Sequence, residues 1–163
     1  MKELNKNDLV HAIVHASIPC IKSFFDNHKG EHFYGFAIET LAEQGYIHLC
    51  ANSIEAYKPT YDQYIKQGFS EEIIEGEKWN NQEWEYFDFN CDCQIWEENW
   101  SVTENLIEEY SSSNSSKVFN SYLSVFKEAV SEAFEQITKT DIFEQITKTE
   151  DFRSFILEHN DAF

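Results

Sequence analysis

Three short segments of alternating apolar and polar residues limit what this chain can fold into, because two are neighbours and the third lies near the end. Residues 33–40 and 46–51 alternate like the strands of a β-hairpin, and residues 152–158 alternate again. Helical patterns fill the remaining length. We therefore predict an α+β fold, in which several helices pack on a small, mostly antiparallel sheet. The 163 residues are expected to form a single domain, with Phe36 and Ile38 in its core.

Apolar residues spaced three and four apart predict one helix before the hairpin and another directly after it. A proline inside each pattern predicts a kink in each helix. In the first helix the proline could instead break the helix in two. The first helix is expected to begin at Asn7 or Asp8 and to end at Gly30, with Pro19 inside it. The second is expected to begin at a capping box formed by Asn52 and Glu55 and to end at Gly68, with Pro59 inside it.

The second half of the chain is expected to be mainly helical. A capping box at 101–104 predicts the start of a short helix, and the Ser-rich run 111–116 predicts a loop. A long helix is predicted over 117–138 from its apolar stripe. Residues 71–100 are harder to assign, although 83–93 has the alternation of a further strand.

The heptapeptide FEQITKT occurs twice, at 134–140 and at 143–149. An offset of nine residues advances an α-helix by two and a half turns. One straight helix would therefore place the two phenylalanines on opposite faces. We predict instead that the long helix ends near Thr140, and that Asp141 caps a short new turn before the last strand.

Cysteine and histidine are the candidate metal ligands. No secretory signal is recognisable at the N-terminus, so we expect a cytoplasmic protein whose cysteines (Cys20, Cys50, Cys91 and Cys93) are reduced. His11 and His15 lie one helical turn apart and, with Cys91 and Cys93, have donor types that suit zinc. However, Ala12 replaces the glutamate of a zinc-protease motif, and there is one tight cysteine pair where structural zinc sites use two. We favour structural roles for these residues and predict no cofactor.

Catalytic motifs give no support for an enzyme. The chain has no G-x-S-x-G turn, no phosphate-binding P-loop and no G-x-G-x-x-G motif. Its 30 Asp and Glu residues make accidental carboxylate pairs frequent, so such pairs do not indicate acid–base chemistry. The sequence therefore favours a binding protein that is not an enzyme.

Charge is distributed unevenly along the chain. The formal charge is −18, and residues 71–109 contribute −12 of it, with 13 acidic residues against the single base Lys78. All four tryptophans lie in the same window. Such a surface repels nucleic acid and anionic membranes, whereas aromatic anchors surrounded by carboxylates suit a basic protein partner. The alternative is a solvated acidic face over tryptophans that belong to the core.

Within this window we expect one group of residues to contact the partner. The carboxylates nearest to a tryptophan are the best candidates, because Trp84 would be the anchor if its ring were exposed. The predicted partner-binding residues are Glu83, Trp84, Glu85 and Asp88, followed by Trp79, Asp92, Glu97 and Glu98.

Four motifs follow one another along most of the chain: FYGFAIET at 33–40, LCANSIEA at 49–56, KWNNQEWEYFDF at 78–89 and DFRSFILEHND at 151–161. Their order resembles the bacterial family catalogued as domain of unknown function 4303. Lys78 stands where that family usually has arginine, and the duplicated heptapeptide displaces the turn before the last strand. The resemblance implies a fold but no settled activity. Proteins of this type are similar in size to the immunity proteins that protect bacteria from toxins.

We therefore expect a cytoplasmic immunity protein that occludes the active site of a basic toxin. A nuclease is the favoured toxin, because a cleft that attracts a polyanion is positively charged and an acidic surface complements it. Two alternatives remain open. One is a DNA mimic that blocks a nucleic-acid-binding protein, and the other is a small hydrolase that uses a pair of carboxylates.

Overall fold

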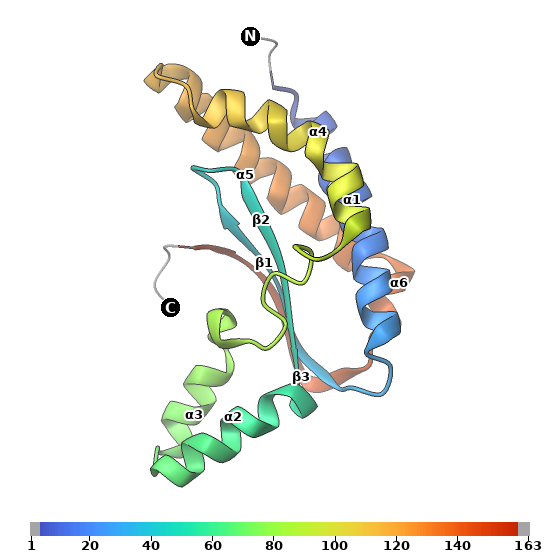
Figure 1. Ribbon diagram of the computed structural model, residues 1–163, viewed down its shortest axis with the longest axis vertical. Coiled ribbons are helices and arrows are strands. Elements are labelled where there is room, and N and C mark those ends of the chain that lie inside the picture. The colour runs from blue at the N-terminus through green and yellow to red at the C-terminus, as the bar shows by residue number, and fades with distance from the viewer. Residues whose placement is uncertain (1–3, 160–163) are drawn as a thin grey trace.

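The computed structural model describes residues 4–159 and has an α+β fold, as predicted. Figure 1 shows an elongated molecule in which α1, α4 and α5 lie together at one end and α2 and α3 at the other. The elements in chain order are α1 (Lys6–Asn27), β1 (Phe33–Leu41), β2 (Tyr46–Ser53), α2 (Ile54–Gln67), α3 (Glu71–Lys78), the 3-10 helix η1 (Asn81–Glu83), α4 (Gln94–Ser111), α5 (Ser116–Thr138), α6 (Asp141–Glu144) and β3 (Lys148–Glu158).

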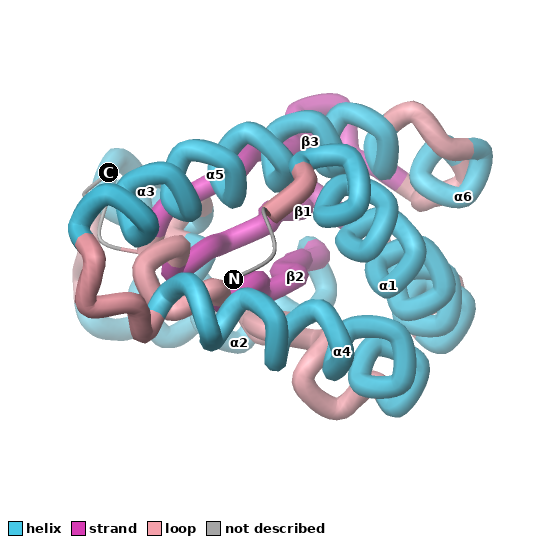
Figure 2. Tube along the Cα trace, turned by 90° about the horizontal axis from the view of Figure 1, so that it is seen from above, coloured by secondary structure: helices cyan, strands magenta, loops and turns pink. Residues whose placement is uncertain are grey.

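The sheet contains three strands in the order β2-β1-β3, and Figure 2 shows β1 between its two neighbours. The predicted hairpin is confirmed, with β1 antiparallel to β2. The predicted late strand is also present, but it begins earlier, at Lys148, and runs parallel to β1. It starts beside the beginning of β1, where the Phe33 amide donates to the Thr147 carbonyl at 2.9 Å. The sheet is therefore mixed rather than mostly antiparallel.

One face of the sheet is covered by α1, α4, α5 and α6 and holds the larger core. Phe36 and Ile38 are fully buried there, as predicted. The duplicated heptapeptide is split as expected, because α5 ends at Thr138 and α6 begins at Asp141. Both of its phenylalanines now pack against Phe36, with ring centroids 6.5 Å away for Phe134 and 5.1 Å away for Phe143.

The other face holds a smaller cluster beneath α2, α3 and the segment that follows them. Its buried members are Tyr34, Ala37, Cys50, Tyr57, Ile74 and Trp84. Simple alternation would place Tyr34 on the same face as Phe36, but the pairing register shifts between Phe33 and Gly35. This irregularity turns Tyr34 to the second face. On this second face the Trp84 indole lies against Gly35, where an added Cβ would stand 2.4 Å from the ring.

The predicted starts of three helices need correction, each by a small shift in the capping residue. Asn5, rather than Asn7 or Asp8, caps α1. Ser53, rather than Asn52, caps α2, and Glu55 binds His32 instead of closing a capping box. Thr140, rather than Asp141, caps α6.

Helix ends and prolines follow the predictions in part. α1 ends at Asn27, and Gly30 lies beyond it in the following turn with φ of +103°. Pro19 and Pro59 both lie inside continuous helices, so Pro19 does not split α1. Gly68 ends α2 in the left-handed conformation, as predicted.

Residues 71–111 differ most from the prediction. The segment 101–104 does not start a helix but lies inside α4, which already begins at Gln94. The segment 83–93 is not a strand: Glu83 ends η1, and the rest is mostly turns, with a single bridge between Tyr86 and Ala51. The Ser-rich loop is confirmed over 112–115, since α4 ends at Ser111, and the long helix is confirmed with a start one residue earlier, at Ser116.

Candidate functional site

A groove of about 310 Å³ runs between β2 and α4 and brings together residues that are far apart in the sequence. We call it the acidic groove. Strand β2 supplies one wall, the turns at 88–91 supply the end, and one face of α4 supplies the other wall. Its lining residues are Tyr46, Ile47, His48, Asp88, Asn90, Cys91, Trp96, Glu97, Trp100, Ser101 and Glu104.

Asn90 holds the turns at 88–91 against the edge of β2. Its side chain accepts from the Leu49 amide at 2.5 Å and donates to the Ile47 carbonyl at 3.0 Å. The Phe89 amide also donates to the Leu49 carbonyl at 2.9 Å. The amide side chain thus satisfies the backbone groups that a further strand would otherwise pair. This explains how 83–93 follows β2 without being a strand.

Asp88 lies at the mouth of the groove in an uncommon backbone conformation, with φ of +54°. Aspartate tolerates the left-handed region better than most residues. Its Oδ1 atom is 2.9 Å from Nδ1 of His48, and both side chains are about one-quarter exposed. The left-handed turn therefore directs this carboxylate toward β2 rather than along the chain.

The α4 wall combines aromatic rings with carboxylates. Residues at 96, 97, 100, 101 and 104 share one helical face because they are spaced by three and four. The Trp96 and Trp100 rings lie 5.4 Å apart and are almost fully buried, so they form the floor. Glu97 and Glu104 are exposed above them.

The groove carries negative charge. Asp88, Glu97 and Glu104 line it, and no lysine or arginine is among its lining residues in the part of the chain that the structure describes. Cys91 also lines the groove. Burial, then the nearby carboxylates of Asp88 and Asp92, raise the pKa of its thiol. The groove therefore offers a negative field and an uncharged thiol rather than a nucleophilic thiolate.

The structure divides the predicted partner-binding residues between two places. Asp88 and Glu97 line the acidic groove, and Asp92 and Glu98 are exposed on the segments that form it. Glu83 and Glu85 are exposed but do not line the groove. Sequence reasoning missed Tyr46, His48 and Glu104; the spacing of Glu97 and Glu104 by one heptad was the available signal for Glu104.

The expected tryptophan anchors are not exposed. Trp84 is 4% exposed, and its Nε1 atom donates to the Lys78 carbonyl at 2.9 Å. Trp79 is half-buried between the Arg153 guanidinium, 4.1 Å from the ring centroid, and Lys78. The condition for Trp84 to act as an anchor is therefore not met. The most exposed aromatic ring at the acidic groove is that of Tyr46, at 46%.

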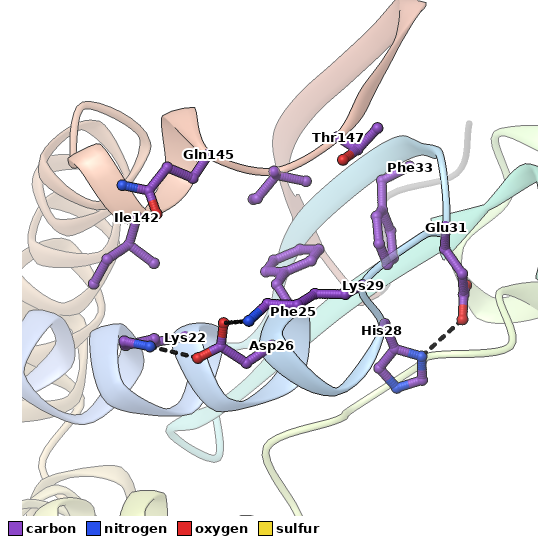
Figure 3. A pocket seen from close by; sticks show the side chains of 11 residues that line it. Lys22, Phe25, Asp26, His28, Lys29, Glu31, Phe33, Ile142, Gln145 and Thr147 are labelled. Atoms are coloured by element: carbon purple, nitrogen blue, oxygen red, sulfur yellow. Dashed lines mark hydrogen bonds and ion pairs between the residues drawn. The ribbon is translucent and has the colours of Figure 1, made fainter.

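A second pocket, of about 120 Å³, lies between the end of α1 and α6 and is shown in Figure 3. It contains His28 together with Lys22 and Lys29, which are among the few lysines of this acidic chain. However, Lys22 and Lys29 both pair with Asp26, and His28 contacts Glu31 at 2.9 Å. Because these charges are compensated locally, the pocket has little attraction for an anion.

The candidate metal ligands do not form a cluster. His11 and His15 stack with ring centroids 5.7 Å apart on the exposed side of α1. The described residues contain no group of three or more His, Cys, Asp or Glu side chains arranged to hold a metal ion. None of the described helices has the length and apolar character needed to cross a bilayer.

The fold and the groove define a small α+β protein that presents an acidic, aromatic-floored surface. The sequence pattern of the family described as domain of unknown function 4303 matches residues 13–162. The chain belongs to this family. No significant match is found among curated proteins or among solved structures.

Proposed function

We propose that this protein is an immunity-type inhibitor, which binds a basic bacterial toxin through the acidic groove and blocks the toxin's active site. A nuclease is the favoured toxin, and the bacterial cytoplasm is the place where such protection is needed. The proposal rests mainly on one observation: Asp88, Glu97 and Glu104 surround an aromatic floor, and no lysine or arginine of the described residues lines the groove.

Physical reasons favour this combination over acidity alone. Carboxylates on the rim of a site raise the association rate with a positive partner, whereas a concave apolar floor slows dissociation once water is excluded. A nuclease cleft must attract phosphates, so it carries the positive field that the groove complements. A formal charge of −18 extends this attraction beyond the groove.

The test is co-expression with the protein encoded immediately upstream, with bacterial growth as the measurement. We expect that protein to be toxic alone and harmless with the wild-type chain. Glu97→Lys with Glu104→Lys should abolish protection, because it reverses two charges in the groove. Glu144→Lys with Glu150→Lys makes the same net change on exposed residues outside the groove, and this control should still protect.

Each alternative result is informative. Equal protection by the two double variants would exclude the acidic groove as the binding site. Absence of toxicity or of protection would contradict the immunity function for this gene pair. Inhibition of unrelated DNA-binding proteins by the purified chain would instead support a DNA mimic, and turnover of a substrate by the purified chain would support an enzyme.

A further inference from the structure

A second groove, of about 610 Å³, lies between α2 and α3 at the opposite end of the molecule from α4 (Figure 1). We call it the α2–α3 groove. Its apolar lining comes from Ile54, Tyr57, Tyr61 and Ile74. Tyr57 is buried and its hydroxyl donates to the Ile74 carbonyl at 2.9 Å, which ties the two helices together at the base. The groove is therefore a formed feature of the fold.

Exposed apolar side chains are concentrated around this groove. Five of the nine large apolar residues that are exposed in the described chain belong to α2, α3 or the turn between them. Scattered single residues of this kind are ordinary, but a group on neighbouring elements indicates an interaction surface, and Ile54 and Tyr61 line the groove itself. The five are Ile54, Tyr61, Ile65, Phe69 and Ile73.

The charges around the groove are not balanced once local ion pairs are counted. Lys78 pairs with Asp151 at 2.6 Å and lies 4.0 Å from Glu75, and Lys58 pairs with Asp62 at 3.0 Å. The carboxylates of α3 then remain in excess. Glu71 and Glu75 line the groove, and Glu72 is exposed beside them. The apolar floor therefore has an acidic rim along α3.

We propose that the α2–α3 groove is a docking site for an amphipathic helix of a partner protein, with lysine or arginine beside its apolar face. The open space between two helices suits a helix laid lengthwise, with apolar anchors at successive turns. The acidic rim selects basic flanking residues. A second copy of this chain is a poor occupant, because docking would bring the acidic α3 helices of two strongly negative molecules together. This proposal does not depend on the proposed function of the acidic groove.

The test uses a fluorescent peptide of about 18 residues, which forms several helical turns. Leucines at positions i, i+3, i+4 and i+7 make an apolar face, and lysines flank it. Two further peptides serve as controls: one has glutamate in place of lysine, and the other has the same composition in an order without an apolar face. Fluorescence anisotropy at about 150 mM salt, where long-range attraction is screened, should detect micromolar binding only for the first peptide.

Two variants locate the peptide on the protein. Ile54→Ser with Tyr61→Ser removes exposed apolar contacts without changing charge, and should weaken binding by about tenfold or more. Ile95→Ser with Val102→Ser makes a matched change on exposed residues of α4 and should leave the affinity within about twofold. Circular dichroism checks that both variants are folded.

Several results would overturn the proposal. They are no binding of the basic amphipathic peptide at millimolar concentration, equal binding of either control peptide, and unchanged affinity in the Ile54/Tyr61 variant. A dimer in sedimentation equilibrium that dissociates in the same variant would show that the groove takes a second copy instead. None of these results involves the acidic groove, so failure here leaves its proposed function intact.

Discussion

The two faces of the sheet differ in what their side chains are used for. The face beneath α1, α4, α5 and α6 is filled almost entirely by apolar residues from long helical stripes. The opposite face has a small aromatic cluster and several buried polar residues. Among the latter, Glu39 is 1% exposed and accepts from Asn81 and from His159. Both proposed binding grooves are built from elements outside the α1–α5 pair.

This difference teaches that the two faces are held together in different ways, although the acidic groove takes its floor, Trp96 and Trp100, from the first-face core. Large apolar areas on the first face supply most of the hydrophobic free energy of folding. The second face uses specific contacts, such as the Trp84 ring over Gly35, to place segments that have little regular structure. Substitutions on the two faces should therefore have effects of different size and kind.

The largest effect is expected for Phe36→Ala on the first face. Phe36 is fully buried between Phe134 and Phe143, so its removal leaves a cavity that the helices cannot easily fill. The free energy of unfolding should fall by about 3–5 kcal/mol. Urea denaturation followed by circular dichroism measures it. A midpoint close to that of the wild type would show that this face is not the main core.

A smaller effect is expected for Gly35→Ala on the second face. The new methyl group would meet the Trp84 ring at 2.4 Å, and forced overpacking of this kind costs about 1–3 kcal/mol. Gly76→Ala in α3 is the matched control. An added Cβ there has nothing within 4 Å, and alanine favours the helix, so stability should be unchanged or slightly higher. If both variants are equally stable, the contact of Trp84 with Gly35 does not constrain this face.

The smallest effect is expected at Glu31, which binds His28 after α1, Ser53 at the end of β2 and Tyr86 in the following turns. Burial alone would raise its pKa, but hydrogen bonds from Ser53, His28 and Tyr86 outweigh burial and lower the pKa below the ordinary 4.5. The pKa of Glu31 is lower in the folded than in the unfolded protein, so the ionised carboxylate stabilises the fold. This stabilisation is complete above pH 4.5 and is lost as the pH falls through the folded-state pKa. Glu31→Gln should therefore lose stability at pH 7 and approach the wild type in acid.

Urea denaturation of both proteins at pH 7 and at about pH 3.5, below the ordinary glutamate pKa, measures this change. Asp8→Asn is a suitable control, because Asp8 is exposed at the start of α1. A difference between Glu31→Gln and the wild type that does not shrink in acid would show that Glu31 acts through packing rather than through its charge.

The first face could be predicted from the sequence because its elements are periodic. The α1 and α5 stripes, the hairpin and the burial of Phe36 and Ile38 all follow from spacing alone. The direction of β3 could not be predicted in this way. Alternation determines which side chains of a strand share a face. It does not determine whether the strand runs parallel or antiparallel to β1.

The acidic groove was predictable only in part. The charge of residues 71–109 pointed to a segment that supplies much of the lining of the groove, including Asp88 and Glu97. The position of Trp84 was not predictable, because it depends on the space that the missing side chain of Gly35 leaves in a distant strand. Asn90 was missed for a similar reason: a side chain that replaces strand pairing leaves no periodic signal.

The most direct test of the account is the association rate of this chain with the protein encoded immediately upstream, measured by stopped flow over a range of salt concentrations. Glu97→Lys with Glu104→Lys changes the formal charge by +4, from −18 to −14, and so does the control pair Glu144→Lys with Glu150→Lys. We predict that only the first pair slows association steeply and flattens its dependence on salt. If the control pair slows association as much, only overall charge matters, and the acidic groove is not the binding site.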